Sequence, residues 1–116
     1  MPVERLNNVR KHPLIPDSMP EERALELFRR ARQQALAKDF SEALSSLAYL
    51  LKLVGDDPVV RAEIDRVENQ RREDVALTLI KARKLLNSGD RRGAQRKVEV
   101  VLFMHPGHHE ATQLLD

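Results

Sequence analysis

The sequence predicts an all-α protein: two antiparallel helical hairpins, a long helix over about residues 58–88 that links them, and a short C-terminal helix. Three observations support this prediction. Leu, Ala, Arg and Glu dominate the composition, which is typical of helices. Apolar residues recur with helical spacing. A stretch at 24–54 also recurs, diverged, at 75–105 with an offset of 51 residues. The matching residues are Ala31 and Ala82, Arg32 and Arg83, Asp39 and Asp90, Ala43 and Ala94, and Leu51 and Leu102.

Length and composition limit the class of protein. A chain of 116 residues fits one domain, predicted at 18–116, after a flexible N-terminal arm at 1–17 that holds three prolines. The absence of Cys excludes disulfides and thiolate metal sites. No apolar run approaches the roughly 18 residues that cross a bilayer, and the N-terminus lacks the apolar stretch of a secretory signal. We therefore expect a cytoplasmic protein with no membrane span.

The first hairpin is predicted from capping signals and apolar spacing. Its first helix begins near Ser18, whose spacing to Glu21 fits a capping box. Asp39 and Glu42 repeat that spacing before a second helix, and two helices joined by so short a turn pack antiparallel. The expected apolar stripes are Leu25, Phe28, Ala31, Ala35 and Leu36 in the first helix, and Ala43, Leu44, Leu47, Leu50, Leu51 and Val54 in the second.

The long helix is predicted to start at Pro58, with Asp57 as its cap. No Gly or Pro occurs from 59 to 88, and the apolar positions keep helical phase. A charged centre at 68–74 interrupts the apolar stripe, so a break near Gln70 that gives two shorter helices is the alternative. The expected apolar positions are Val60, Ile64, Val67, Val75, Leu79, Ala82 and Leu86.

The second hairpin turns at Gly89, the residue that adopts a left-handed helix cap without strain. Its partner helix spans 90–104, and a His-Pro-Gly turn leads to a last short helix at 108–115. We expect Ala94, Val98, Val101 and Leu102 to face inward. We also expect the aromatic residues in core or hairpin contacts, with Tyr49 at least half buried; they are Phe28, Phe40, Tyr49 and Phe103.

The second copy of the recurring stretch resembles the tetratricopeptide repeat. Counted from Val75, it has Ala82 at position 8, Gly89 and Asp90 at 15 and 16, Ala94 at 20 and Pro106 at 32. The first copy, counted from residue 24, matches more weakly. In the family, small residues at 8 and 20 let two helices approach closely. The offset of 51 departs from the family's 34 residues, and two units are fewer than the three usual in such arrays.

This resemblance implies a non-enzymatic protein–protein interaction module: an adaptor, scaffold or chaperone-like protein that binds a peptide or helix of another protein. Position 9 of each first helix lines the family's concave groove, and here it is Arg32 and Arg83. Arg pairs bidentately with carboxylates. The alternative is that both arginines lie on solvated faces or pair with Glu residues of the chain. The expected partner-binding residues are Arg32, Gln33, Arg83, Lys84 and Asn87.

Two other functions stay open. In the first alternative, the chain is a self-associating structural protein: a homodimer joined through Val60, Ile64 and Val67. In the second it binds nucleic acid through a basic cluster at 81–97, since basic residues displace phosphate counterions. No aromatic residue interleaves this cluster to stack bases, which makes nucleic acid the weaker alternative. The cluster comprises Lys81, Arg83, Lys84, Arg91, Arg92, Arg96 and Lys97, with Asp90 as its one acid.

Metal and catalytic chemistry are not expected. His105, His108 and His109 with Glu110 suggest a metal, but a Pro-Gly pair separates the first two and closed zinc sites recruit at least three fixed ligands, which favours a solvated turn. The chain has no phosphate-binding glycine loop, HExxH motif or nucleophile elbow. We therefore predict no enzyme, no cofactor and no metal site.

Overall fold

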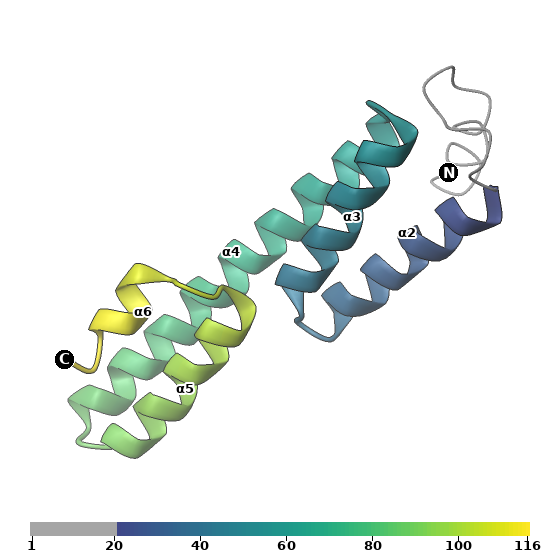
Figure 1. Cartoon of the computed structure of the whole chain (residues 1–116). Helices are drawn as coiled ribbons and strands as arrows, with labels where there is room; N and C mark the ends of the chain where they lie inside the picture. Colours follow the sequence, from purple (N-terminus) through teal and green to yellow (C-terminus); the bar gives the residue numbers. More distant parts are fainter. Residues whose placement is uncertain (1–20) are drawn as a thin grey trace. The chain divides into compact units, whose positions relative to one another are not determined.

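A computed structural model describes residues 21–116, in which every regular element is an α-helix (Figure 1). The all-α prediction is thus confirmed. The predicted arm at 1–17 and the Ser18 end of the first capping box lie outside the described residues. The chain divides into two compact units, of which the first ends at Glu68 and the second is Asn69–Asp116.

The first unit contains α2 (Glu21–Leu36), α3 (Phe40–Val54) and the N-terminal part of α4 (Pro58–Asn87). Residues 37–39 join α2 to α3, which returns along it (Figure 1), and the two helices pack against each other. The helical spacing of apolar side chains brings one stripe of each helix into the core. The buried residues are Ala24, Leu27, Phe28, Ala31 and Ala35 of α2, and Phe40, Ala43, Leu47, Leu50 and Val54 of α3.

The prediction that Leu36 belongs to the buried apolar stripe of α2 is wrong. Leu36 is 83% exposed, whereas Leu27, which was not assigned to the stripe, is 4% exposed. At about 100° per residue, Leu36 lies about 140° around the helix from Ala31, but Leu27 lies only about 40° from it. Leu27 therefore faces the core and Leu36 faces water.

Helix α4 is continuous for 30 residues, so the predicted long helix is confirmed and the break near Gln70 does not occur. Its start is capped as expected: Asp57 Oδ1 accepts the backbone N–H of Val59 at 2.8 Å and of Val60 at 3.4 Å. Within the charged centre, Gln70 Nε2 donates to Asp74 Oδ1 at 3.1 Å one turn later. Contacts of this i, i+4 type support a helix where apolar burial is interrupted.

The second unit contains the C-terminal part of α4, α5 (Arg91–Met104) and α6 (His109–Gln113). Helices α5 and α6 pack against each other, and α5 returns along the end of α4 (Figure 1). The buried residues here are Val75, Leu79, Ala82, Ala94, Val98, Val101, Met104 and Ala111.

The aromatic residues divide into two pairs. Phe28 and Phe40 are 3% and 0% exposed, as predicted. Phe103 is 54% exposed, so its expected core position is wrong, and Tyr49, at 52%, is slightly more exposed than predicted. Phe103 lies half a turn around α5 from Ala94, which faces the core.

The α2–α3 and α4–α5 corners have the same backbone hydrogen bonds, 51 residues apart. The N–H of Asp39 donates to Gln34 O at 2.9 Å and that of Asp90 to Leu85 O at 2.8 Å. One residue earlier, Lys38 and Gly89 each donate to a carbonyl three residues back, at 3.0 Å. This pair of bonds is the Schellman motif, which satisfies carbonyls at a helix end. In this motif the backbone φ is positive, 65° at Lys38 and 88° at Gly89. The prediction that Gly89 adopts the left-handed conformation is thus confirmed.

Small residues occupy matched buried positions beside these corners. Ala31, Ala43, Ala82 and Ala94 are all 0% exposed. A methyl side chain permits close approach of two helix backbones, and a larger one at a fully enclosed site must displace its neighbours.

The caps after the two corners differ. Asp90 Oδ1 accepts the N–H of Gly93 at 2.8 Å, whereas Asp39 makes no side-chain cap bond. A Cβ on Gly93 would lie 2.4 Å from the Asp90 carboxylate. The matching residue of the first unit is Glu42, which carries a Cβ. The capping bond predicted for Asp39 is therefore wrong, whereas Asp90 makes this bond with its carboxylate in the space that Gly93 leaves open.

Candidate partner-binding site

The five predicted partner-binding residues fall into two sets. Arg32 and Gln33 are exposed on α2 in the first unit. Arg83, Lys84 and Asn87 are exposed on α4 in the second unit. In each set the side chains belong to one helix, and each set is a separate candidate surface.

Arg32 has an aromatic support. Its guanidinium carbon lies 6.0 Å from the centre of the Phe28 ring, one helical turn earlier, and Phe28 is 3% exposed. A guanidinium over an aromatic ring at an exposed site gains about 0.5–1 kcal/mol. This contact restricts the Arg32 side chain and presents a planar cation at the surface of the first unit.

Arg83 already has a carboxylate partner. Its Nη2 pairs with Glu110 Oε2 of α6, and both side chains are about half exposed. For this arginine the structure shows pairing with a Glu of the same chain, the alternative left open by the sequence. Exposed pairs of this kind contribute little to stability.

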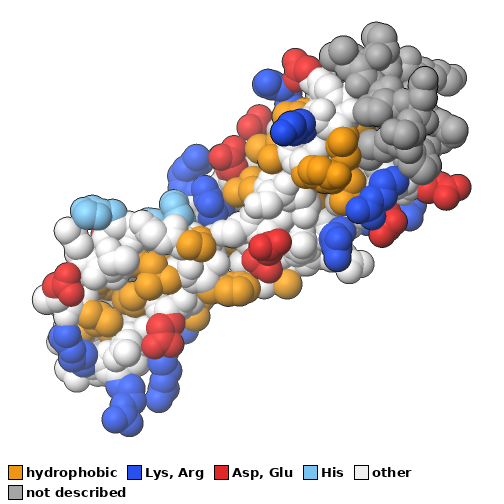
Figure 2. All heavy atoms as spheres, in the orientation of Figure 1, with side chains coloured by type: hydrophobic (Ala, Val, Ile, Leu, Met, Phe, Trp, Pro, Cys, Tyr) orange, Lys and Arg blue, Asp and Glu red, His pale blue; other side chains and the backbone are white. Residues whose placement is uncertain are grey.

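The basic cluster at 81–97 is divided between structural and solvent-facing roles. Arg83 pairs with Glu110, and Arg91 Nη2 donates to the carbonyl oxygen of Leu115 after α6. Asp90, the one acid, accepts the backbone N–H of Gly93 as the cap of α5. The remaining cations of the cluster make no ion pair within residues 21–116; they are Lys81, Lys84, Arg92, Arg96 and Lys97. Figure 2 shows Lys and Arg side chains over the end of the second unit.

Four large apolar side chains of the second unit are exposed, and sequence reasoning missed them as a group. Leu77 and Ile80 of α4 are 58% and 45% exposed, and Val100 and Phe103 of α5 are 45% and 54% exposed. Orange side chains lie beside the basic ones over this unit in Figure 2. The signal was present in the sequence, because Leu77 and Ile80 fall out of phase with the buried stripe of Val75 and Leu79.

The histidines hold the turn between α5 and α6. His108 Nδ1 accepts the N–H of Ala111 at 3.2 Å, a cap for α6, and the His105 and His108 rings meet edge to face at 4.9 Å. Burial, then the charge of Arg71, then that of His108 lower the pKa of His105. Within residues 21–116, no three His, Asp or Glu side chains gather closely enough to hold a metal ion.

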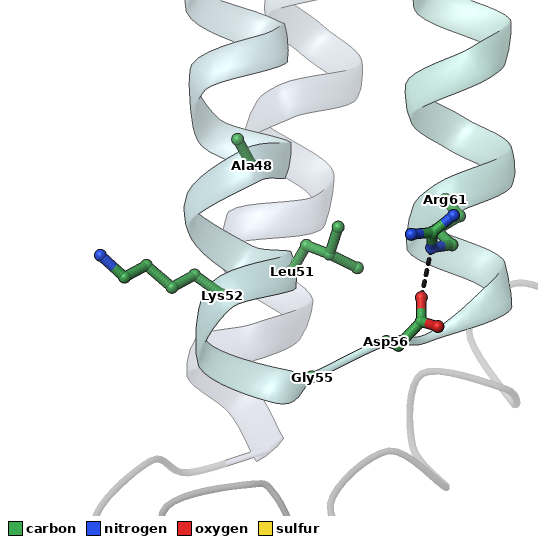
Figure 3. Close-up of a pocket in the computed structure, with 6 residues that line it drawn as sticks. All are labelled: Ala48, Leu51, Lys52, Gly55, Asp56 and Arg61. Atoms are coloured by element: carbon green, nitrogen blue, oxygen red, sulfur yellow. Dashed lines mark hydrogen bonds and ion pairs between the residues drawn. The ribbon is translucent and has the colours of Figure 1, made fainter.

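A shallow depression lies between the end of α3 and the start of α4 in the first unit (Figure 3). Asp57 caps α4, and the neighbouring Asp56 pairs with Arg61 at this depression. The charges of Asp56 and Arg61 neutralise each other, and the remaining charged residue of the lining, Lys52, points away from this pair in Figure 3. Its lining residues are Ala48, Leu51, Lys52, Gly55, Asp56 and Arg61.

No family model, curated protein or solved structure matches this chain. None of the helices from residue 21 onward combines the length and apolar character needed to cross a membrane.

Proposed function

We propose that this chain is a non-enzymatic protein-interaction module of the tetratricopeptide type, which binds a peptide or helix of a partner protein. The observation that carries the proposal is the match between the two corners, with the same Schellman bonds and four buried alanines at a spacing of 51 residues. Repeated helical units of this kind offer preformed surfaces for other chains. The partner-binding residues of the proposal are Arg32 and Gln33 on the first unit, and Arg83, Lys84 and Asn87 on the second.

The charged and apolar groups of the described surface also favour binding over catalysis. Asp57 and Asp90 cap helices. Glu63, which is 8% exposed, accepts hydrogen bonds from both Nε and Nη2 of Arg66. These acids are thereby committed to the fold. The side chains exposed to solvent include cations of the second unit, Arg32 and several apolar residues, groups that suit recognition of another chain.

The structure weakens the self-association alternative. Its interface used Val60, Ile64 and Val67, but Val60 and Val67 are 0% exposed and lie in the core of the first unit. A homodimer through this stripe would require the unit to open. The cytoplasmic location expected from the sequence stays a prediction, and so does the weaker nucleic-acid alternative.

The test is affinity purification of the tagged chain from native extract, followed by mass spectrometry and direct titration of each captured protein. We expect a partner that binds the purified chain stoichiometrically and binds less tightly to the Arg32→Glu and Arg83→Glu variants. Gln34→Glu is the matched control on α2, because Gln34 bonds to Ser46 of the same hairpin at 2.9 Å. A chain that captures no protein but binds nucleic acid with a steep salt dependence would overturn the proposal.

A further inference from the structure

We infer that the second unit binds an acidic amphipathic helix of a partner protein on the side of the α4–α5 pair that faces away from α6. This inference rests on the proposed function and deepens it by naming the surface and the chemistry of the partner. The binding face comprises Leu77, Lys81 and Lys84 of α4 and Arg96, Lys97 and Val100 of α5.

Helical spacing groups the residues on each helix. Leu77, Lys81 and Lys84 are spaced i, i+4 and i+7, which places them on one stripe of α4. Arg96 and Lys97 come one turn before Val100 on α5. Five of the six residues are exposed and Lys97 is partly exposed, so the face is open to solvent.

Two contacts of α6 locate this face on the opposite side of the helix pair. Helix α6 is joined to α4 through Arg83 and Glu110, and the chain after it is joined to α5 through Arg91 and the Leu115 carbonyl. Around α4, Lys81 lies about 160° from Arg83, and around α5, Val100 lies about 180° from Arg91. Lys81 and Val100 therefore share the side that α6 leaves uncovered.

The charge of the face selects an acidic partner. It carries four cations, and none of them pairs with a carboxylate within the described part of the chain. The whole second unit has nine Lys and Arg against six Asp and Glu, a net charge of +3. An acidic helix gains from this field both in encounter rate and in specificity.

The shape of the face favours a helix over a membrane surface. Two packed helices lie about 8–10 Å apart and leave a furrow between them, into which side chains of a third helix insert. Leu77 and Val100, at 58% and 45% exposed, are the apolar residues that the two helices contribute to this face. Peripheral membrane helices rely on Trp and Phe beside the basic residues, whereas the chain has no Trp and α4 and α5 carry a single aromatic residue, the exposed Phe103 one turn after Val100.

The test uses a synthetic helical peptide of about 18 residues, with a Leu stripe flanked by Glu, titrated into the full chain by fluorescence polarisation. Leu77→Glu with Val100→Glu, and separately Lys81→Glu with Lys97→Glu, should each weaken binding at least about tenfold. A second peptide with Lys in place of Glu should bind the Lys81→Glu, Lys97→Glu chain better than it binds the wild type. This exchange of charges separates recognition from mere loss of folding.

Leu36→Glu is the matched control, because Leu36 is an exposed apolar residue of the first unit, and it should leave binding unchanged. Equal loss of binding in this control, or an indifferent response to the charge exchange, would overturn the inference. So would tighter binding to phosphatidylserine vesicles than to the peptide, or a dimer that buries this face. If a native partner is captured but ignores these variants, the proposed function stands and this inference fails.

Discussion

Lys38 and Gly89 occupy the same position in two identical helix corners, and both have a positive φ although only one of them is glycine. The left-handed region costs an L-residue roughly 1–2 kcal/mol, which Gly does not incur. The two corners thus have the same left-handed backbone conformation at this position with different residues. The bonds of the Schellman motif, rather than the identity of the left-handed residue, maintain the corner in the first unit.

Replacing Lys38 by Gly should therefore stabilise the protein by about 0.5–1 kcal/mol, since relief of the left-handed strain exceeds the added entropy of the unfolded chain. Gly89→Ala should destabilise it by about 1 kcal/mol, a purely conformational cost because a Cβ there meets nothing within 4 Å. Urea unfolding measures both changes. Lys38→Ala is the control for the Lys side chain, and a Lys38→Gly no more stable than Lys38→Ala would contradict the account.

Enlarging the buried alanines tests the packing beside the corners. Ala43→Leu and Ala94→Leu should each destabilise the chain by about 1–3 kcal/mol, because both sites are 0% exposed and the added atoms must displace neighbours. Thermal unfolding followed by circular dichroism reports the loss. Ala62→Leu, at an exposed position of α4, should change stability little. Wild-type stability in either core variant would show that the alanines are not tightly enclosed.

Asp90 and Gly93 should be energetically coupled. In the wild type, Asp90→Ala should cost about 1 kcal/mol, the value of a helix cap. In a Gly93→Ala background the new Cβ displaces the Asp90 carboxylate, so the same substitution should cost almost nothing. A double-mutant cycle from urea unfolding measures the coupling, and additive effects of the two substitutions would argue against this explanation of the cap.

The lowered pKa of His105 makes stability depend on pH. Because the folded state holds the His105 proton less tightly than the unfolded state, the unfolded chain binds more protons as the pH falls through the ordinary histidine pKa of about 6.5. Stability should therefore decrease on acidification through that region, and His105→Gln should flatten the decrease. In an NMR titration, Arg71→Gln should raise the His105 midpoint by removing a nearby positive charge. A midpoint that does not move would exclude this role for Arg71.

The main elements of the fold could be predicted because their signals are local. Asp57 marks a helix start by its capping side chain, and Pro58 and Gly89 mark helix ends by their backbone geometry. The phase from Val60 to Ala82 correctly indicated one continuous helix. The errors arise where local signals compete. Ala35 and Leu36 are adjacent and cannot both face the core, and the smaller residue is the one that does.

The candidate surfaces were harder to predict because they depend on contacts between distant segments. Arg83 was expected to face a partner, but its pairing with Glu110 depends on how α6 packs on the second unit. The exposed positions of Leu77 and Val100 follow from helical phase, yet their common side becomes evident only once the contacts of Arg83 and Arg91 with the C-terminal segment are known.

The central claim is that two matched helical units enclose four equivalent alanines. Solvent paramagnetic relaxation of alanine methyl groups, measured by NMR with a soluble gadolinium chelate, tests it most directly because the effect reports the depth of each methyl below the surface. We expect strong protection at Ala31, Ala43, Ala82 and Ala94, all 0% exposed, and fast relaxation at the exposed Ala62 and Ala76. Relaxation of any of the four at the rate of Ala62 or Ala76 would contradict the claim.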